Sequence, residues 1–219
     1  MDLYTYFLDN TGRPIHKNMH YFPVYQRHFA PFAGRPMTLI EIGGGAGGSS
    51  QMWKRYFGPN ARIVVLDINP DCRAFEDETV KVRIGDQADH GFLRAVVEEF
   101  GAPDVVIDDG SHQMAAIAAT FTFLYRHTNP NGIYLIEDLH TAYWPEFGGG
   151  LRVPGSFIER CKDMIDELNA DNTRRALPPT EITRATLSMH FYDSIVVFER
   201  GVSHDKRSVV TGHTPLDLG

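Results

Sequence analysis

Short runs of apolar and β-branched residues alternate with segments of helical period through most of the chain. The runs at 37–42, 63–67, 80–84, 104–108 and 133–136 have the length and composition of buried parallel strands. Between them, apolar residues in 49–57, 91–100 and 113–127 recur at helical spacing and predict amphipathic helices. Strands and helices in alternation predict right-handed crossovers. The expected fold class is therefore α/β, a Rossmann-like, doubly wound and mostly parallel sheet.

The C-terminal part departs from this alternation. We predict a helix over 156–169, with Ser156 as its N-cap and Ile165 on its buried side. Strand-like segments follow at 186–191, 194–199 and 206–210, and the last two are close enough to form a hairpin. The sheet is thus expected to end in an antiparallel hairpin.

A single domain accounts for all 219 residues, with a core over 37–219. Residues 1–36 have no strong period but are rich in aromatic residues and histidines, so we treat them as an N-terminal cap segment. Within it, residues 20–29 can form a short helix with Tyr21, Tyr25 and His28 on one face. That helix either packs against the sheet edge or forms a lid over a substrate cleft.

Composition and charge narrow the class of protein. A hydrophobic content of 42% and a charged content of 22% are typical of a soluble globular protein. The net charge of −7 argues against nucleic acid or an anionic membrane as partner. Cys72 and Cys161 have no metal or redox spacing, the N-terminus does not read as a signal peptide, and no stretch reaches the length of a membrane span. We therefore expect a cytoplasmic protein.

Two of the expected strands end in paired carboxylates, Asp108-Asp109 and Glu137-Asp138. Ligands bind at the carboxyl ends of strands in an open α/β sheet, and neighbouring ends lie at one edge. Carboxylates gathered there repel each other unless a cation lies among them. His112 and His140 follow closely after the two pairs. The pattern favours a metal site with a histidine base beside it.

A glycine-rich turn after the first strand predicts a nucleotide-like ligand. Glycines allow close approach of the backbone, and the following helix start offers free N–H groups. The turn fits both the dinucleotide pattern and the E-x-G-x-G-x-G pattern of S-adenosylmethionine sites. The acidic end of the next strand would accept hydrogen bonds from ribose, and the third strand end would contact adenine. The cofactor-binding residues expected on this basis are Glu41, Gly43, Gly45, Gly47, Asp67, Asp86 and Gln87.

Several motifs together resemble one family. They are His16-Lys17, residues 20–29, Glu41-Ile42-Gly43-Gly44-Gly45, Gly85-Asp86-Gln87, residues 107–112 and residues 136–144. From about Ile15 to Gly201 the chain resembles the class I S-adenosylmethionine-dependent methyltransferases. Within them it is most similar to the Mg²⁺-dependent macrolide-sugar O-methyltransferases, the mycinamicin sugar O-methyltransferase family. The resemblance implies a class I methyltransferase fold, S-adenosylmethionine and Mg²⁺ as cofactors, and a sugar or glycoside as the small-molecule acceptor.

Residue roles also follow from the resemblance. It implies Mg²⁺ binding by Asp109, Glu137 and Asp138, and proton abstraction by His112. Asp108, whose role the resemblance does not specify, is expected to face the methionine part of the cofactor, with a second metal ligand as the alternative. His140 is a second catalytic candidate, although it could equally be a ligand or cap the next loop. Tyr21, Tyr143 and Trp144 are expected on the acceptor side, and the aromatic N-terminal segment suggests a homo-oligomer.

Three other functions remain compatible with these residues. A catechol-type O-methyltransferase also pairs Mg²⁺ with carboxylates, and it would methylate simple catechols. An NAD-dependent oxidoreductase would use the same glycine turn. A non-catalytic S-adenosylmethionine-binding protein would keep the fold without transfer.

Overall fold

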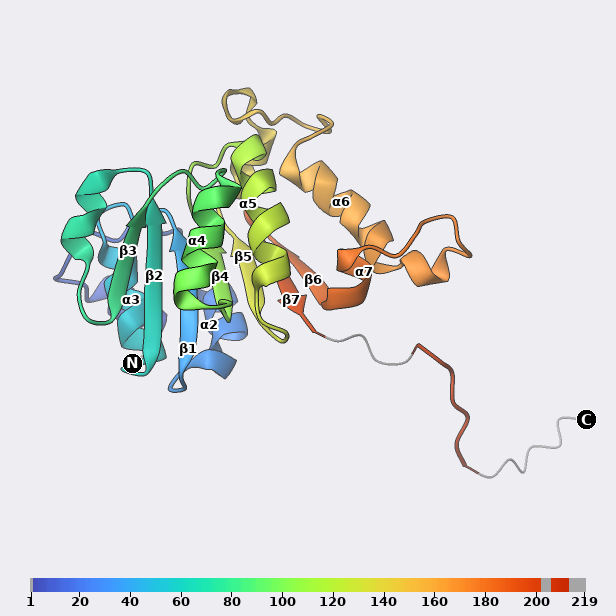
Figure 1. Ribbon diagram of the computed structural model, residues 1–219, viewed down its shortest axis with the longest axis horizontal. Helices are drawn as coiled ribbons and strands as arrows, with labels where there is room; N and C mark the ends of the chain where they lie inside the picture. The colour runs from blue at the N-terminus through green and yellow to red at the C-terminus, as the bar shows by residue number, and fades with distance from the viewer. Residues whose placement is uncertain (1, 202–205, 213–219) are drawn as a thin grey trace, which may run out of the picture.

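The computed structural model describes residues 2–201 and 206–212 (Figure 1). Within these ranges one seven-stranded sheet has the order β3-β2-β1-β4-β5-β7-β6. Strands β1 to β5 are parallel, while β7 is antiparallel to β5 and β6 is antiparallel to β7. The predicted fold class is confirmed. The strands are β1 (Met37–Ile42), β2 (Ala61–Asp67), β3 (Val80–Ile84), β4 (Val105–Asp108), β5 (Ile133–Ile136), β6 (Thr186–Tyr192) and β7 (Ile195–Arg200).

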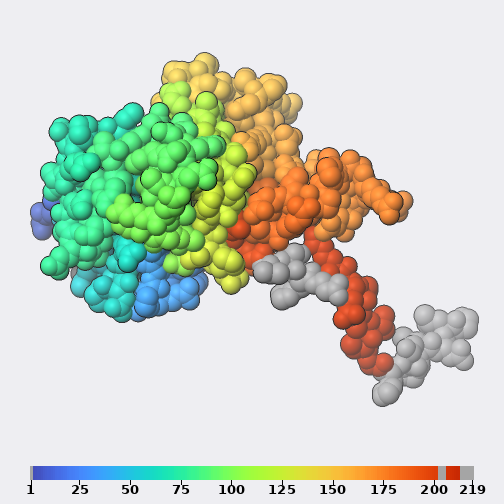
Figure 2. Space-filling model, in the orientation of Figure 1, coloured from blue at the N-terminus to red at the C-terminus, as the bar shows by residue number. Residues whose placement is uncertain are grey.

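Helices cover both faces of the sheet and make three layers (Figure 1). One face carries α4 (His90–Phe100), α5 (Met114–His127), α6 (Phe157–Leu168) and α7 (Glu181–Ala185). In Figure 2, α4 and α5 form the continuous green surface over this face. The other face carries α1 (Leu3–Leu8), α2 (Phe22–Phe29) and α3 (Gly48–Phe57). Short 3-10 turns are η1 (Met19–Tyr21), η2 (Ala30–Phe32), η3 (Pro70–Phe75), η4 (Leu139–Tyr143), η5 (Pro145–Phe147) and η6 (Ala170–Asn172).

Successive side chains of a strand point to opposite faces of the sheet, so each strand contributes to two hydrophobic cores. In β2, Ile63 and Val65 pack under α2 and α3, whereas Val64 and Leu66 pack under α4 and α5. All four side chains are at most 1% exposed, so each contributes about 1.5–3 kcal/mol through burial. Because both faces are covered, these strands are continuously apolar. β2 and β4 accordingly end in Asp67 and Asp108, whereas the edge strand β3 carries Lys81 and Arg83 along its length.

Two sequence predictions about the C-terminal part are wrong. The hairpin is made by β6 and β7, and residues 206–210 form no strand. A tight turn at Asp193-Ser194, with Ser194 in the left-handed region, joins β6 to β7 and brings them into register. Ile165 is 43% exposed, and Met164 takes the buried position on α6. Ser156 does cap α6, since its side chain accepts a hydrogen bond from the Glu159 N–H.

The N-terminal segment packs on a face of the sheet, against α3, rather than at the sheet edge. The rings of Tyr25 and Phe29 on α2 meet the Trp53 ring edge-on, at centroid distances of 5.2 and 5.7 Å. Both side chains are fully buried. Among the described residues, none of the helices has the length and hydropathy to cross a membrane.

Candidate active site

The carboxyl ends of three adjacent strands form the floor of the candidate site. β1 lies beside β4 and β4 lies beside β5, with Ile42, Asp108 and Ile136 in register. The residues that follow are therefore brought together, as the sequence predicted. They are the glycine turn after β1, Asp109 after β4 and Glu137 after β5.

The glycine turn has a backbone that only glycine adopts without strain. Gly43, Gly45 and Gly47 have φ angles of 91°, 48° and 78°. At Gly43 a Cβ would lie 2.1 Å from the carbonyl oxygen of Asp109, so the two loops are in close contact. Gly47 is the N-cap of α3, which leaves the first N–H groups of that helix facing the turn.

Two adjoining pockets open along this edge. One is lined by Asp67, Asp86, Gln87 and Ser111, and the other by Lys17, the glycine turn, Asp109, His112 and Asp138. Gly43, Asp67 and Gly110 line both, so the pockets form one cleft. A ligand lying along it would extend from the ends of β2 and β3 to the acidic residues.

Two residues predicted to bind cofactor, Glu41 and Gln87, have their polar atoms engaged in the interior. Glu41 accepts hydrogen bonds from Trp53 Nε1 at 2.8 Å and Ser50 Oγ at 3.2 Å. The Gln87 amide donates to Asp108 Oδ1 at 3.1 Å, and its oxygen accepts from the Ser111 N–H at 2.7 Å. These residues hold the walls of the cleft together.

Asp108 is 1% exposed, and its Oδ2 has no hydrogen-bond partner among the described residues. Burial raises the pKa of its carboxyl to about 7. Asp67, in contrast, lines the cleft and accepts from the Gly44 N–H at 2.7 Å and the Asn69 N–H at 2.8 Å. Its two oxygens are thus oriented by backbone donors on both sides.

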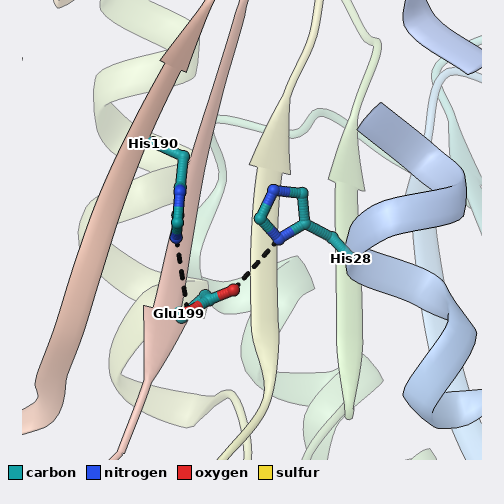
Figure 3. Close-up of side chains that lie close together, drawn as sticks. All are labelled: His28, His190 and Glu199. Atoms are coloured by element: carbon teal, nitrogen blue, oxygen red, sulfur yellow. Dashed lines mark hydrogen bonds and ion pairs between the residues drawn. The ribbon is translucent and has the colours of Figure 1, made fainter. Parts of the chain in front are cut away.

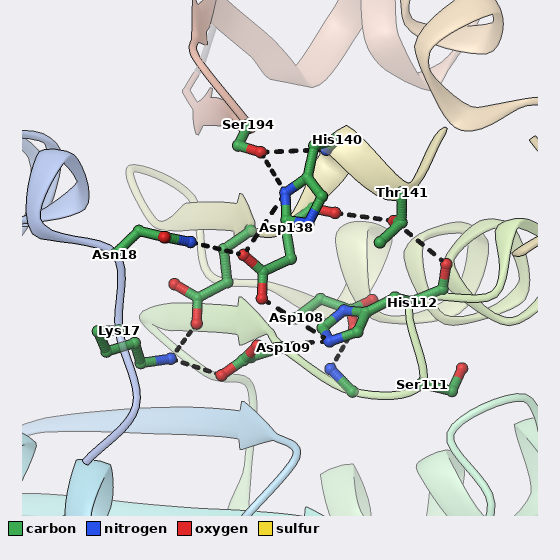
Figure 4. A network of polar contacts seen from close by, with 12 residues as sticks. Lys17, Asn18, Asp108, Asp109, Ser111, His112, Asp138, His140, Thr141 and Ser194 are labelled. Carbon is green, nitrogen blue, oxygen red and sulfur yellow. Dashed lines mark hydrogen bonds and ion pairs between the residues drawn. The ribbon is translucent and has the colours of Figure 1, made fainter. Parts of the chain in front are cut away.

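Asp109, His112 and Asp138 form a cluster whose ligand atoms all lie within 4.8 Å of one another. His112 Nε2 is 4.0 Å from Asp109 Oδ1 and 3.8 Å from Asp138 Oδ2. His112 and Asp138 both have φ of 57°, a left-handed conformation that turns each side chain into the cleft. Figure 4 shows His112 on one side of the cluster and Lys17 with Asn18 on the other.

Lys17 is a site residue that reasoning from the local pattern did not single out. Its ammonium forms ion pairs with Asp109, at 2.5 Å, and with Glu137, and its side chain is only 3% exposed. Although burial opposes it, the charges of Glu137 and Asp109 raise the pKa of Lys17 far above its usual range. Burial and the Asp109 charge raise the pKa of Glu137, and Lys17 opposes that rise. The only sequence signal for Lys17 was its place in the His16-Lys17 motif.

Two tyrosines of the N-terminal segment also contact the carboxylates. Tyr25 donates its hydroxyl hydrogen to Glu137, and Tyr21 donates to Asp138 Oδ1 at 2.5 Å. Asn18 donates to the same Asp138 oxygen at 3.3 Å. Tyr21, predicted on the acceptor side, is 1% exposed and faces Asp138. The cap segment thus holds the carboxylates in place while it packs on the core.

His140 lies on the opposite side of Asp138 from His112. Its Nδ1 is 2.6 Å from Ser194 Oγ and 3.9 Å from Asp138 Oδ1. Its ring meets the Trp144 ring edge-on at 4.8 Å. Trp144 and Tyr143, predicted on the acceptor side, are 44% and 48% exposed and so lie at the surface.

The surroundings of His112 favour its neutral form. Burial lowers the pKa of His112, although the charges of Asp138 and Glu137 oppose the shift. The imidazole is therefore neutral near pH 7, the form that accepts a proton. It lies at the mouth of the cleft, where its side chain is 25% exposed.

The donor set fits a magnesium ion. Mg²⁺ prefers carboxylate oxygens. Asp109 and Asp138 offer them in the cleft, and the buried Glu137 carboxylate shares the Lys17 ammonium with Asp109. A divalent cation would offset the mutual repulsion of these carboxylates, which the single Lys17 ammonium offsets in part. Glu137 is linked to the cluster by the Lys17 ammonium, which pairs with both Glu137 and Asp109.

No protein-family model matches the chain. Curated relatives do match it. It is 37% identical to the 8-demethyl-8-alpha-L-rhamnosyl tetracenomycin-C 2'-O-methyltransferase of Streptomyces olivaceus, over 82% of this chain and 50% of that protein. It is 36% identical to the mycinamicin VI 2''-O-methyltransferase of Micromonospora griseorubida, over 84% of this chain and 49% of that protein. The chain spans about half the length of these relatives.

Among solved structures, the chain superposes on the MycE methyltransferase of mycinamicin biosynthesis, determined with Mg, S-adenosylhomocysteine and mycinamicin VI. The TM-score is 0.80 and the identity 32%, over 95% of this chain and 55% of that one. These comparisons confirm the family resemblance and the fold class expected from the sequence.

Proposed function

We propose that this chain, a homologue of the sugar O-methyltransferases with the class I methyltransferase fold, transfers a methyl group from S-adenosylmethionine to a hydroxyl of a sugar or glycosylated natural product. The observation that carries the proposal is the cluster of Asp109, His112 and Asp138 beside the glycine turn. The relatives named above are O-methyltransferases of a rhamnosyl tetracenomycin C and of mycinamicin VI, which supports a glycoside as acceptor. They are methyltransferases, and this leaves the NAD-dependent alternative without support from them.

The residues have separate tasks in this reaction. The glycine turn and Asp67 bind S-adenosylmethionine along the cleft, with Asp86 and Gln87 toward its adenine. Asp109, Asp138 and Glu137 would hold Mg²⁺, which when bound lowers the pKa of an acceptor hydroxyl. Lys17, Tyr25 and Tyr21 fix the orientation of these carboxylates.

His112 accepts the proton of the acceptor hydroxyl as its oxygen attacks the sulfonium methyl. The C–S bond breaks as the C–O bond forms, and the products are the methyl ether and S-adenosylhomocysteine. Neutral His112 suits this step because its Nε2 faces the cluster of oxygen ligands. The enzyme's remaining contribution is alignment of the two substrates.

The test is S-adenosylhomocysteine formation by the purified protein with Mg²⁺ and S-adenosylmethionine. The acceptor panel contains an O-demethyl rhamnosylated polyketide, a demethylated macrolide glycoside and a simple catechol. We expect methylation of a glycoside, detected by mass spectrometry, and loss of turnover with chelator or with Asp109→Asn. Turnover of the catechol alone would favour the catechol-type alternative. S-adenosylmethionine binding without turnover of any acceptor would favour the non-catalytic one.

A further inference from the structure

A second cluster of side chains with potential metal-ligand atoms lies between α2 and the β6–β7 hairpin. We propose that His28, His190 and Glu199 bind a transition-metal ion, with Zn²⁺ as the best-fitting species. Their ligand atoms all lie within 4.8 Å of one another. Figure 3 shows both imidazole rings turned toward the Glu199 carboxylate.

Sheet register brings two of these residues together. Glu199 on β7 is the partner of Ser188 on β6, and His190 lies two residues further along β6, on the same face. α2 packs over this face and supplies His28, which is 3% exposed. The cluster thus joins a helix to a distant hairpin, since 171 positions separate His28 from Glu199 in sequence.

The distances between the ligand atoms fit a tetrahedrally coordinated ion. His28 Nδ1 is 3.0 Å from Glu199 Oε1, and His190 Nε2 is 3.3 Å from Glu199 Oε2. Ligands bound at about 2.0–2.1 Å in a tetrahedron are about 3.4 Å apart, so small side-chain shifts would admit the ion. Two imidazoles and one carboxylate form a donor set that suits zinc rather than magnesium.

Neighbouring hydroxyls would hold the ligands in place. His28 Nε2 is 2.9 Å from Tyr192 Oη, so an Nε2–H bond to this hydroxyl leaves the Nδ1 lone pair facing the cluster. Ser188 Oγ donates to Glu199 Oε2 at 2.6 Å. The side chains of His190 and Glu199 are 25% and 35% exposed, which leaves a route from solvent and room for a water ligand.

A metal ion at this position would stabilise the arrangement of the candidate active site. On α2, His28 is one helical turn after Tyr25, whose hydroxyl contacts Glu137. An ion between α2 and the β6–β7 hairpin would fix the helix that presents this tyrosine. The site would therefore stabilise structure, whereas the acidic cluster is the one proposed for transfer.

Zn²⁺ binding is measured by calorimetry on the full chain with Mg²⁺ in excess, so that the oxygen ligands of the acidic cluster are occupied. We expect one equivalent of Zn²⁺ to bind, and His190→Gln or Glu199→Gln to weaken its binding by more than about 10-fold. Tyr192→Phe should weaken it by about 10-fold. Co²⁺ should give the visible absorption of a four-coordinate site in the wild type but not in His190→Gln or Glu199→Gln.

His90→Gln is the matched control, because His90 is an exposed histidine on α4 that contacts the Ala119 carbonyl. It should leave Zn²⁺ binding unchanged, and circular dichroism verifies that each variant is folded. If wild type takes up no Zn²⁺ under these conditions, or if folded His190→Gln binds it as tightly as wild type, the three residues are a hydrogen-bonded cluster only and the proposal fails.

Discussion

Lys17 Nζ lies 2.5 Å from Asp109 Oδ2, although 92 positions separate the two residues in sequence. The contact joins the N-terminal segment to the end of β4, in the middle of the acidic cluster. A buried ammonium here offsets the repulsion among carboxylates that would otherwise oppose folding. Lys17 is thus part of the same electrostatic unit as the residues proposed to bind Mg²⁺.

Removing this lysine should make folding depend on the metal. Lys17→Met leaves the buried Glu137 and the partly exposed Asp109 without their cation, and we expect a loss of about 3–5 kcal/mol in the free energy of unfolding. Mg²⁺ should restore more stability to the variant than it adds to wild type, because it then neutralises the larger residual charge. Thermal unfolding with and without Mg²⁺ measures both effects.

Lys54→Met is the control for that experiment. Lys54 pairs with Asp77 at 3.0 Å, but the two side chains are 41% and 49% exposed. A surface pair of this kind contributes less than about 1 kcal/mol. Equal destabilisation by the two lysine substitutions would contradict the role assigned to Lys17.

The two histidines beside Asp138 should differ in their effect on transfer. His112→Gln is expected to lower kcat by about 10²–10⁴-fold, because it removes the proton acceptor that faces the cluster. His140→Gln should lower it less, since Nδ1 of His140 is engaged with Ser194. Steady-state kinetics measure kcat, and calorimetry with S-adenosylhomocysteine verifies that the cofactor site is intact. The larger loss in His140→Gln would reverse the assignment.

Much of this site follows from local sequence. The apolar runs that end at Asp108-Asp109 and Glu137-Asp138 predict buried strands, and parallel neighbours necessarily bring those ends together. The glycine turn is equally local, because only glycine tolerates its φ angles without strain. The carboxylates, the turn and His112 therefore gather at one edge, as expected.

What the sequence did not predict depends on long-range packing. The approach of Lys17 to Asp109, and of Tyr25 to Glu137, is set by how the N-terminal segment packs on α3. Glu41 has the expected position in its motif, but the side chain turns inward because Trp53 offers a donor there. The segment 206–210 has β-branched residues but pairs with no strand of the described ranges, which composition alone does not reveal.

Gly43 should be essential to the contact between the glycine turn and Asp109. Gly43→Ala adds a Cβ that would lie 2.1 Å from the Asp109 carbonyl oxygen, and it also forces alanine to a φ of 91°. Because the clash displaces a residue of the site, we expect transfer to fall by about 100-fold. Activity assays measure the loss of transfer, and chemical unfolding of the same preparation measures the loss of stability.

Gly101→Ala separates strain from clash. Gly101 has a φ of 82°, and nothing lies within 4 Å of the Cβ that alanine would add. Its cost should be only the strain of a positive φ combined with a ψ of 179°, about 1–3 kcal/mol, with transfer unchanged. Should Gly43→Ala behave in the same way, the close approach of the two loops has no functional importance.

Asp108 should make the protein less stable as the pH rises. Burial raises the pKa of its carboxyl from 3.8 to about 7, so the folded state binds its proton more tightly than the unfolded state. The contribution of this carboxyl to the stability of the folded state is then most favourable below pH 3.8, and it is lost progressively as the pH rises to about 7.

Asp108→Asn keeps an acceptor for the Gln87 amide and carries no charge. The stability of this variant relative to wild type should increase across that range, by up to about 4 kcal/mol at its upper end. Urea unfolding at several pH values measures the difference, and a difference that stays constant from acid to neutral pH would contradict the raised pKa.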